Sequence, residues 1–357
     1  MIPITKPFLP PREEYIQYVD DIWKRNWLTN NGPLVKELEL KLKEYLSVKH
    51  LLFLGNGTIA LQIAIKALEL KGEIITTPFS YVATTSSIVW EGCTPVFVDV
   101  DATMNINPLL IEAAITKKTS AILATHVYGN PCDIAAIAKL AKKYNLKVIY
   151  DAAHCFGSMY KGKSVFNYGD ITIGSFHATK IFHTIEGGAV TTKDKALIKK
   201  MSHLRNFGHA GPDKFIGVGI NGKNSEFHAA MGLTNLKYVD EILAKRKSDH
   251  QLYDNHLQHL QLQKPLVLKN AGYNYSYYPV AFKTEKDCKK VFDGLQKYNV
   301  FTRRYFYPLL STLDYVKHKK MPVADNLSKR ILCLPLYFEL SKAEIDLICK
   351  MIIRILK

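Results

Sequence analysis

Lys180 stands in the stretch of this chain whose residue types most suggest chemistry. The segment GSFHATKIFHTIEGGAV, residues 174–190, places small polar side chains around this one lysine and follows it with a glycine pair and an apolar run. Most lysines are solvated surface charges. Lys180 is therefore either a surface lysine in an ordinary loop or an amine held in a pocket, where it can attack a carbonyl group or move a proton.

Two further stretches carry candidate groups directly after apolar, strand-like runs. In GNGTIAL, Thr58 is placed to cap a helix whose first amides would bind a phosphate, although an ordinary strand-turn-helix connection gives the same pattern. In YDAAHCFG, Asp151 ends the run KVIY, where a carboxylate is costly to bury without a cationic partner. It is otherwise a helix N-cap. His154 follows, either as part of the same site or as a core histidine.

These groups together predict one particular cofactor. Ligands of open α/β sheets bind beyond the carboxyl ends of the strands, so we expect the three stretches to meet in one pocket. A phosphate cradle, a carboxylate and an amine, with Ser175 shortly before Lys180, fit pyridoxal 5′-phosphate. The lysine would form a Schiff base with the cofactor aldehyde. The carboxylate would keep the pyridine nitrogen protonated, which makes the ring an electron sink.

The first two-thirds of the chain alternates apolar runs with helical-period segments. We expect strands at 51–55, 73–78, 95–101, 120–129, 146–153, 171–176 and 188–193. We expect helices at 58–70, 82–91, 108–116 and 133–144. This alternation predicts βαβ crossovers and a largely parallel sheet covered on both faces. The seventh strand follows the sixth through a short Gly-Gly loop, which allows it to enter antiparallel.

The remainder of the chain is mainly helical in period. Helices are expected at 194–206, at 225–259 with a break, at 286–298 and at 341–356, with a strand at 273–282. We therefore expect a large domain, 1–235, and a smaller C-terminal α+β domain, 236–357, since 357 residues exceed one typical domain.

Composition narrows the classes of function. Neither a transmembrane run nor a signal peptide is visible, and six cysteines without a CxxC pair are typical of reduced thiols in a cytoplasmic protein. The net charge of +16 is spread diffusely, without an arginine-rich helix or zinc-finger spacing. We therefore expect no nucleic-acid partner, no membrane association and no metal site. A basic surface also suits an anionic small substrate.

Five segments resemble one known family: SFHATK…EGGAV, DAAHCFG, GNGTIAL, PFSYVAT and GINGKNSEFHAAMG are similar to the DegT/DnrJ/EryC1/StrS family of sugar aminotransferases. The resemblance covers nearly the whole chain. It implies the aspartate-aminotransferase-like fold type I, with a mainly parallel seven-stranded sheet in the large domain. It also identifies Lys180 with the family's Schiff-base lysine. One family branch has histidine at that position and removes a hydroxyl group instead, so Lys180 argues against that branch.

The resemblance implies roles for further residues around the cofactor. Thr58 and Ile59 would offer backbone amides to the phosphate, and Ser175 a hydroxyl. Asp151 would pair with the pyridine nitrogen, and His154 would lie near the phenolic oxygen.

Substrate-side and inter-subunit residues follow in the same way. Tyr81 would stack on the ring unless it is a core tyrosine, and Asn221 would reach the phosphate of the neighbouring subunit unless it is a turn residue. If it does so, the active sites are shared within a homodimer. His183 either contacts the sugar or fills space. Tyr305 and Tyr307, in RRYFYPLL, either lie near the sugar nucleotide or pack between domains.

The implied reaction is amino transfer from L-glutamate to a nucleotide-linked keto-deoxy sugar, with pyridoxamine 5′-phosphate as the intermediate form of the cofactor. WLTNNGP and SFHATK together look most like enzymes that aminate dTDP-4-keto-6-deoxyglucose at C4 for O-antigen or surface polysaccharide. The alternatives are C3 amination of a dTDP-3-keto-6-deoxyhexose, a UDP-linked substrate, and a noncatalytic regulator on the same fold.

Overall fold

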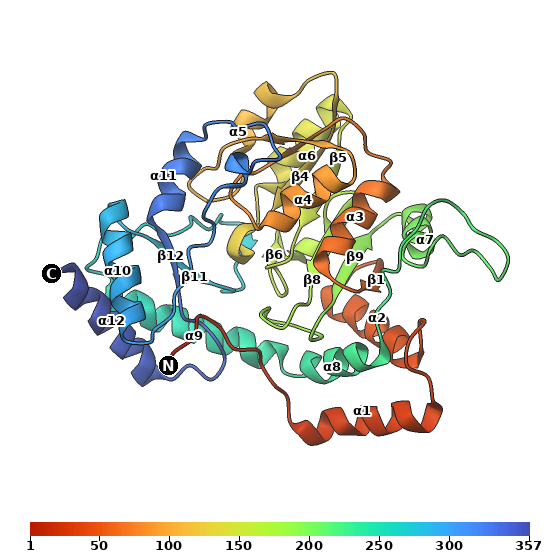
Figure 1. Ribbon diagram of the computed structural model, residues 1–357, viewed down its shortest axis with the longest axis horizontal. Helices are drawn as coiled ribbons and strands as arrows, with labels where there is room; N and C mark the ends of the chain where they lie inside the picture. The colour runs from red at the N-terminus through yellow and green to blue at the C-terminus, as the bar shows by residue number, and fades with distance from the viewer.

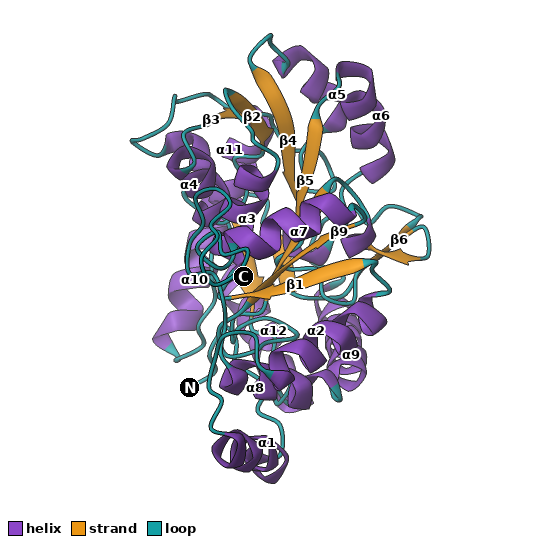
Figure 2. Cartoon of the chain, turned by 90° about the vertical axis from the view of Figure 1, so that its right-hand side faces the viewer, coloured by secondary structure: helices purple, strands orange, loops and turns teal.

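A seven-stranded sheet forms the centre of the molecule. The computed structural model describes residues 1–357, and Figures 1 and 2 show helices on both sides of this sheet. The strands run in the order β1 (His50–Leu54), β9 (Gly188–Thr192), β8 (Ile171–Ser175), β5 (Lys147–Asp151), β4 (Thr119–Thr125), β2 (Glu73–Thr76) and β3 (Thr94–Phe97). Only β9 is antiparallel to its neighbours. The predicted α/β fold class and all seven expected strands are confirmed.

Both faces of the sheet are buried, as a mainly parallel sheet requires. Leu52 and Leu54 of β1 face one core, while Leu51 and Phe53 face the other. The first core is covered by α3 (Gly57–Ala67), α4 (Val82–Trp90) and α7 (Lys195–Leu204). The second is covered by α2 (Pro33–Leu46), α5 (Pro108–Ile111), α6 (Ile134–Tyr144) and α8 (Glu226–Leu236).

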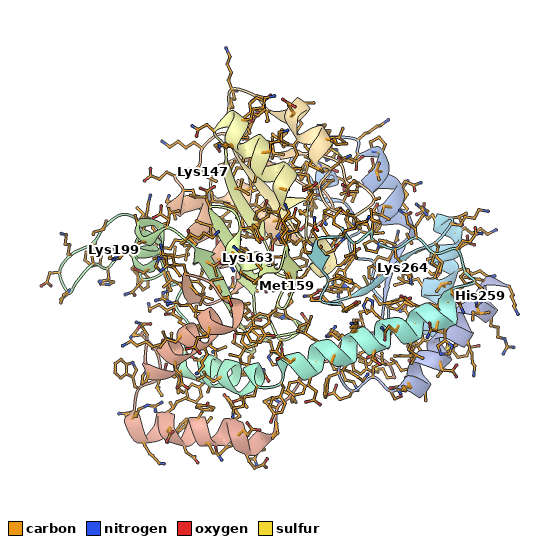
Figure 3. The ribbon with its side chains drawn as sticks, turned by 180° about the vertical axis from the view of Figure 1, so that it is seen from behind. Lys147, Met159, Lys163, Lys199, His259 and Lys264 are labelled. Carbon is orange, nitrogen blue, oxygen red and sulfur yellow. The ribbon has the colours of Figure 1, made fainter.

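The C-terminal elements build a smaller α+β unit. A two-stranded antiparallel sheet of β11 (Tyr278–Ala281) and β12 (Ile331–Leu334) packs with α9 (Val239–Leu257), α10 (Glu285–Lys297) and α12 (Lys342–Leu356). The expected break within 225–259 falls between α8 and α9, which follow one another across the molecule (Figure 3). The capping box that starts α12 is formed by Ser341 and Glu344, as its sequence indicates.

Several elements were not expected from the sequence. They are α1 (Arg12–Arg25), α2, α11 (Pro322–Arg330), β12, and the short strands β6 (Met159–Tyr160), β7 (Lys163–Ser164) and β10 (Ala271–Gly272). Met159 and Lys163 are labelled on the rear of the molecule in Figure 3. The expected strand 273–282 is also shorter, since only Tyr278–Ala281 pairs with β12. No helix combines the length and the apolar character that a bilayer crossing would require.

The N-terminus lies with the C-terminal elements. The Ile2 amide donates to the Asn299 carbonyl at 2.8 Å. Ile2 belongs to the core formed around α9, α10 and α12. Figure 1 marks the start of the chain close to these helices. Farther along the chain, α8 packs on α2 whereas α9 packs on α12. The predicted domain boundary at 235/236 stays a prediction. Ile2, which belongs to the predicted large domain by sequence, packs in the core of the C-terminal elements.

A shared aromatic core fixes the two parts of the molecule against each other. Phe306, from the segment before α11, packs edge-on against Phe79 with ring centroids 5.6 Å apart and stacks on Tyr128 at 5.9 Å. Phe79 and Tyr128 come from the loops that follow β2 and β4. The core therefore holds the segment around Phe306 at the carboxyl edge of the sheet, where a ligand of such a fold binds.

Candidate active site

One cavity of about 380 Å³ lies at the carboxyl edge of the sheet, within the usual size of small-molecule sites. It brings together most of the predicted site residues. Its lining includes Asn56, Gly57, Thr58, Tyr81, Asp151, His154, Ser175, His177, Lys180, Glu186, Tyr277, Arg303, Tyr305 and Phe306. A larger cavity, of about 670 Å³, lies between α9 and the segment 264–279 and contains none of the predicted residues.

The N-terminus of α3 forms one end of the cavity. Helix α3 starts at Gly57, where the amides of Gly57 and Thr58 have no intrahelical partner. A Cβ atom on Gly57 would lie 3.0 Å from the Cβ of Ser175, so glycine lets the helix end approach the Ser175 hydroxyl closely. Free amides, a helix dipole and a hydroxyl together make an anion site.

Two predictions for this helix end need correction. The cap is Asn56, whose Oδ1 accepts from the Ile59 amide at 2.8 Å, and not Thr58. Asparagine and threonine both cap helices well, and because α3 begins at Gly57 the residue in the cap position is Asn56. Because its amide is already hydrogen-bonded, Ile59 is not a free donor for a phosphate in this structure. That leaves Gly57 and Thr58 as the free donors of the first turn.

Asp151 is a buried carboxylate at the end of β5. Its Oδ2 accepts from the Thr84 hydroxyl at 3.1 Å and its Oδ1 from the Ala153 amide at 3.1 Å, so both hydrogen-bond donors are neutral. Burial raises the pKa of Asp151 above its ordinary value, while these two hydrogen bonds and the positive charge of Lys180 oppose the rise. A cationic group placed against Asp151 would offset the cost of burying its charge.

His154 is a buried imidazole with an unsatisfied nitrogen. Its ring stacks on Phe306 with centroids 6.0 Å apart and meets Tyr277 edge-on at 4.9 Å. Burial, with a further contribution from the charge of Lys180, holds the pKa of His154 well below its ordinary value. The neutral ring leaves Nδ1 buried without a hydrogen-bond partner, an arrangement that a ligand atom would relieve.

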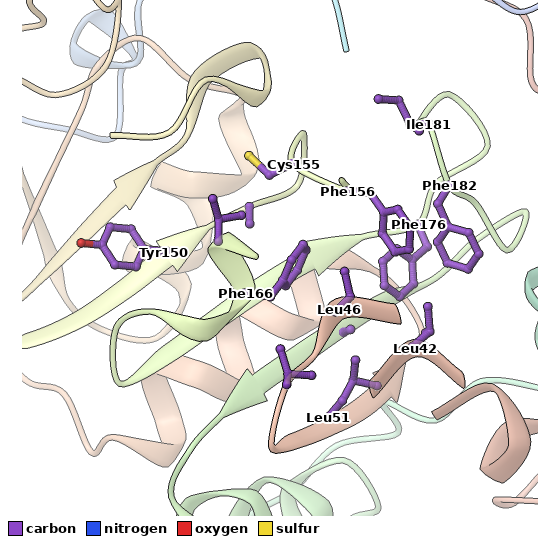
Figure 4. Close-up of a cluster of buried hydrophobic side chains, with 14 of the residues drawn as sticks. Leu42, Leu46, Leu51, Tyr150, Cys155, Phe156, Phe166, Phe176, Ile181 and Phe182 are labelled. Carbon is purple, nitrogen blue, oxygen red and sulfur yellow. The ribbon is translucent and has the colours of Figure 1, made fainter. Parts of the chain in front are cut away.

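The loop that carries Lys180 is anchored on both sides by buried aromatic rings. Phe176 precedes the lysine and Phe182 follows it, with ring centroids 4.9 Å apart, and Phe156 stacks on Phe182 at 4.5 Å. Figure 4 shows these three rings gathered together, with Ile181 labelled beside them. Because both flanks are fixed in the core, the loop between them presents Lys180 to the cavity in a defined position.

The amine of Lys180 is partly withdrawn from water. Its Nζ donates to the Tyr277 hydroxyl at 3.4 Å. Burial lowers the pKa of Lys180, and the nearby Tyr305, Asp151 and Tyr81 oppose the change. A lowered pKa increases the fraction of neutral amine at physiological pH, as a nucleophile or general base requires.

Two residues predicted to contact substrate lie outside the cavity. His183 is buried, with Nε2 2.6 Å from the Phe8 carbonyl oxygen and Nδ1 accepting from the Ile185 amide at 3.2 Å. It fills the core next to Phe182, so its predicted contact with the sugar is wrong. Tyr307 lies on the surface beneath the Arg304 guanidinium, which is 3.7 Å from the Tyr307 ring centroid, and its contact with the sugar nucleotide stays a prediction.

Asn221 also lies outside the cavity of its own chain. It is exposed, and its Oδ1 accepts from Lys223 Nζ at 2.9 Å. Its assignment to a neighbouring subunit stays a prediction.

Sequence reasoning missed Tyr277 and Arg303, which both line the cavity. Arg303 begins the segment RRYFYPLL, so its position beside Tyr305 was a usable signal. Tyr277 is one of several tyrosines in YNYSYYPV, and nothing local distinguishes it from the others.

Comparison with known proteins decides the family. The model of the DegT/DnrJ/EryC1/StrS aminotransferase family matches residues 11–353. The chain belongs to this family. It is 42% identical over 346 residues to dTDP-4-amino-4,6-dideoxy-D-glucose transaminase of Shigella dysenteriae, covering 95% of this chain and 94% of that protein.

Solved structures agree with this assignment. The structure of DesI in the presence of its TDP-sugar product is similar with a TM-score of 0.94 and 32% identity, over 100% of this chain and 93% of that one. NtdA of Bacillus subtilis with bound cofactor PMP is similar with a TM-score of 0.89 and 26% identity, over 96% and 81%. The protein is thus a transaminase that uses pyridoxal 5′-phosphate.

The cavity fits this cofactor. The free amides of α3 beside Ser175 suit its phosphate, and Asp151, buried without a charged hydrogen-bond partner, suits a protonated ring nitrogen. The unsatisfied Nδ1 of His154 suits a polar ring substituent. When bound, the cofactor supplies an aldehyde carbon and an electron-accepting ring.

The raised pKa of Asp151 leads to a prediction about the protein without cofactor. Because the folded pKa lies above the unfolded one, the contribution of Asp151 to folding is most favourable at low pH and is lost as the pH rises. Asp151→Asn should therefore gain stability relative to the wild type as the pH rises above the ordinary aspartate pKa of about 3.9, measured by urea denaturation at a series of pH values. The same variant should lose affinity for the cofactor. A stability difference that is independent of pH would contradict the assigned environment of Asp151.

Proposed function

We propose that this protein transfers the amino group of L-glutamate to C4 of dTDP-4-keto-6-deoxyglucose, giving dTDP-4-amino-4,6-dideoxyglucose for O-antigen or surface polysaccharide. The observation that carries the proposal is the single cavity that joins Lys180, Asp151 and the start of α3. That cavity lies in a chain 42% identical to a transaminase named for this product. The TDP-sugar product of DesI supports the same class of substrate.

The geometry supports a cofactor role for each of these residues. The Gly57 and Thr58 amides and the Ser175 hydroxyl would hold the phosphate, because they form the anion site of the cavity. Asp151 would keep the ring nitrogen protonated, and His154 Nδ1 would bond the phenolic oxygen. Tyr81, which is 56% exposed at the start of α4, has a free ring to cover the cofactor.

Lys180 moves the proton that amino transfer requires. Its Nζ would accept the proton from the α-carbon of the amino acid and hold it for the return transfer, and in the reverse half-reaction it would do the same for the keto sugar. The cofactor, when bound, would supply the electron-accepting ring. Because burial lowers the pKa of this amine, its neutral form, which can accept a proton, is more populated than that of an exposed lysine. The anchored loop keeps Nζ within one small volume during both half-reactions.

The charge of the cavity suits anionic substrates. Arg303 lines the cavity, with its guanidinium 5.2 Å from the ring centroid of Tyr305, and forms no ion pair with an acidic side chain. A guanidinium with free donors recognises a carboxylate or a phosphate in bidentate fashion. Arg303 and Tyr305 therefore contact glutamate in the first half-reaction and the sugar nucleotide in the second.

We further propose that the active form is a homodimer. The segment before Asn221 extends beside α7 in Figure 1. It exposes apolar side chains. Phe207 is 49% exposed, Phe215 62% and Val218 78%. Exposed apolar side chains gathered on one protruding segment mark a protein interface. In a symmetric pair, the same segment of each subunit reaches the other, which brings Asn221 to the partner's phosphate site.

A cytoplasmic location is part of the proposal. All six cysteines are buried and unpaired, as is typical of a reducing compartment.

Two half-reactions test the function directly. L-glutamate should bleach the visible absorbance of the cofactor-loaded protein, and dTDP-4-keto-6-deoxyglucose should restore it, with NMR of the product placing nitrogen at C4. Lys180→Ala should slow both steps by a factor on the order of 10³. The exposed Lys199 of α7, labelled in Figure 3, provides a control, since Lys199→Ala should change neither rate.

Each alternative has its own outcome in this experiment. A product with nitrogen at C3, formed from a 3-keto sugar, would show that the substrate is a 3-keto-6-deoxyhexose. Faster turnover of a UDP-linked sugar would show that the nucleotide is UDP and not dTDP. A protein that shows no cofactor absorbance even after cofactor is added would contradict the enzyme and favour a noncatalytic regulator.

Subunit complementation tests the shared site. Lys180→Ala and Asn221→Ala should each be impaired alone, because each site needs a lysine from one subunit and an asparagine from the other. When the two variants are co-expressed, half of the dimers are mixed and contain one intact site. Activity should then recover to about a quarter of the wild-type value. Activity that equals the mean of the separate variants would rule out sharing through Asn221.

A further inference from the structure

We propose that Tyr277 is a positioning residue for Lys180, whose hydroxyl holds the amine in one place whether the amine carries its extra proton or not. The proposal rests on the proposed role of Lys180 in amino transfer. It concerns a side chain from the C-terminal part of the molecule, which enters the cavity directly before β11.

The geometry places the two groups in direct contact. The Tyr277 hydroxyl lies 3.4 Å from Lys180 Nζ and is the only hydrogen-bond partner of that amine in the structure. The tyrosine ring is held by aromatic neighbours on three sides. Its centroid lies 4.9 Å from that of His154, 5.6 Å from that of Tyr305 and 5.9 Å from that of Tyr128. The hydroxyl therefore has a fixed position from which to direct the amine.

The chemistry of a phenol suits this task. A tyrosine hydroxyl both donates and accepts hydrogen bonds. It accepts from the ammonium form of Lys180 and donates to the lone pair of the neutral amine. Burial raises the pKa of Tyr277 far above the physiological range, so the phenol keeps its own proton throughout. Lys180 can thus gain and lose a proton without leaving its position, and no proton passes to or from Tyr277.

The other groups around the amine come from other elements, and Tyr277→Phe keeps the ring that packs against two of them, His154 and Tyr305. These groups are Tyr81 at the start of α4, Asp151 of β5, His154 and Cys155 of the loop after β5, and Tyr305 of the C-terminal part. Farther round the cavity lie His177, Glu186 and Arg303. The effect of the Tyr277 hydroxyl can therefore be isolated by removing that one oxygen atom.

The direction of the effect follows from hydrogen-bond strength. A hydrogen bond from an ammonium group is stronger than one that involves a neutral amine. Tyr277→Phe should therefore destabilise the charged form more than the neutral form and lower the pKa of Lys180 by about one pH unit. With the cofactor loaded, each half-reaction should slow by about tenfold. The KM values should stay the same, since phenylalanine keeps the ring in the cavity wall and the lost hydroxyl is bonded to Lys180.

The neighbouring Tyr278 provides a matched control. Successive side chains of a strand point to opposite faces, and the Tyr278 hydroxyl donates to Asp254 at 2.7 Å, away from the cavity. Tyr278→Phe removes the same atom from the adjacent residue, the first of β11, and leaves the contact of Lys180 intact. It should leave the pKa of Lys180 unchanged.

The test is a titration of Lys180 in the protein without cofactor. The rate of acetylation of Lys180 by dilute acetic anhydride is followed by peptide mass spectrometry from pH 6 to pH 10 in the wild type and both variants. A lower pKa of Lys180 in Tyr277→Phe alone supports the proposal. An unchanged pKa of Lys180 in both variants, or an equal decrease in both, overturns it. Because no turnover is measured, this result is independent of whether the wild type aminates the proposed sugar.

Discussion

Burial of three ionisable side chains in one small cavity is the constraint on which the rest of the structure depends. The amine of Lys180, the carboxylate of Asp151 and the imidazole of His154 are all withdrawn from water, and burial shifts the pKa of each toward its neutral form. Such groups keep their positions only if the backbone around them is rigid. Parallel pairing of β5 with β8 supplies part of that rigidity, since Asp151 lies opposite Ile173 in the register. The aromatic cluster under the lysine loop supplies another part.

The cavity is completed only where the two parts of the molecule meet. The large sheet provides the phosphate end, the carboxylate and the lysine, whereas Tyr277, Arg303 and Tyr305 come from beyond α9. The aromatic core around Phe306 fixes this junction. A change in the packing of that core would therefore move substrate-side groups relative to cofactor-side groups, even though none of its rings carries out chemistry. Cofactor binding and substrate recognition thus depend on separate stretches of sequence that one core aligns.

Much of this arrangement could be predicted from the sequence, and the failures have local causes. Apolar runs and their spacing predicted every strand of the large sheet, because both faces of a parallel sheet are buried. Asp151, Ser175 and Lys180 follow such strands, so their convergence could be expected. The sequence could not distinguish His183 from the residues that line the cavity, because it lies in the same polar segment as Lys180. Its contact with the Phe8 carbonyl, which places it in the core, is visible only in the structure. Tyr277 reaches Lys180 across a long sequence separation, for which a single sequence carries no signal.

The account claims above all that Lys180, among the many lysines of this chain, is the one that bonds the cofactor. Borohydride reduction of the cofactor-loaded protein, followed by peptide mass spectrometry, tests this claim most directly. We predict a pyridoxyl mass on the peptide that contains Lys180 and on no other peptide. A pyridoxyl group on a different lysine, or none on a protein shown to contain bound cofactor, would contradict the central assignment.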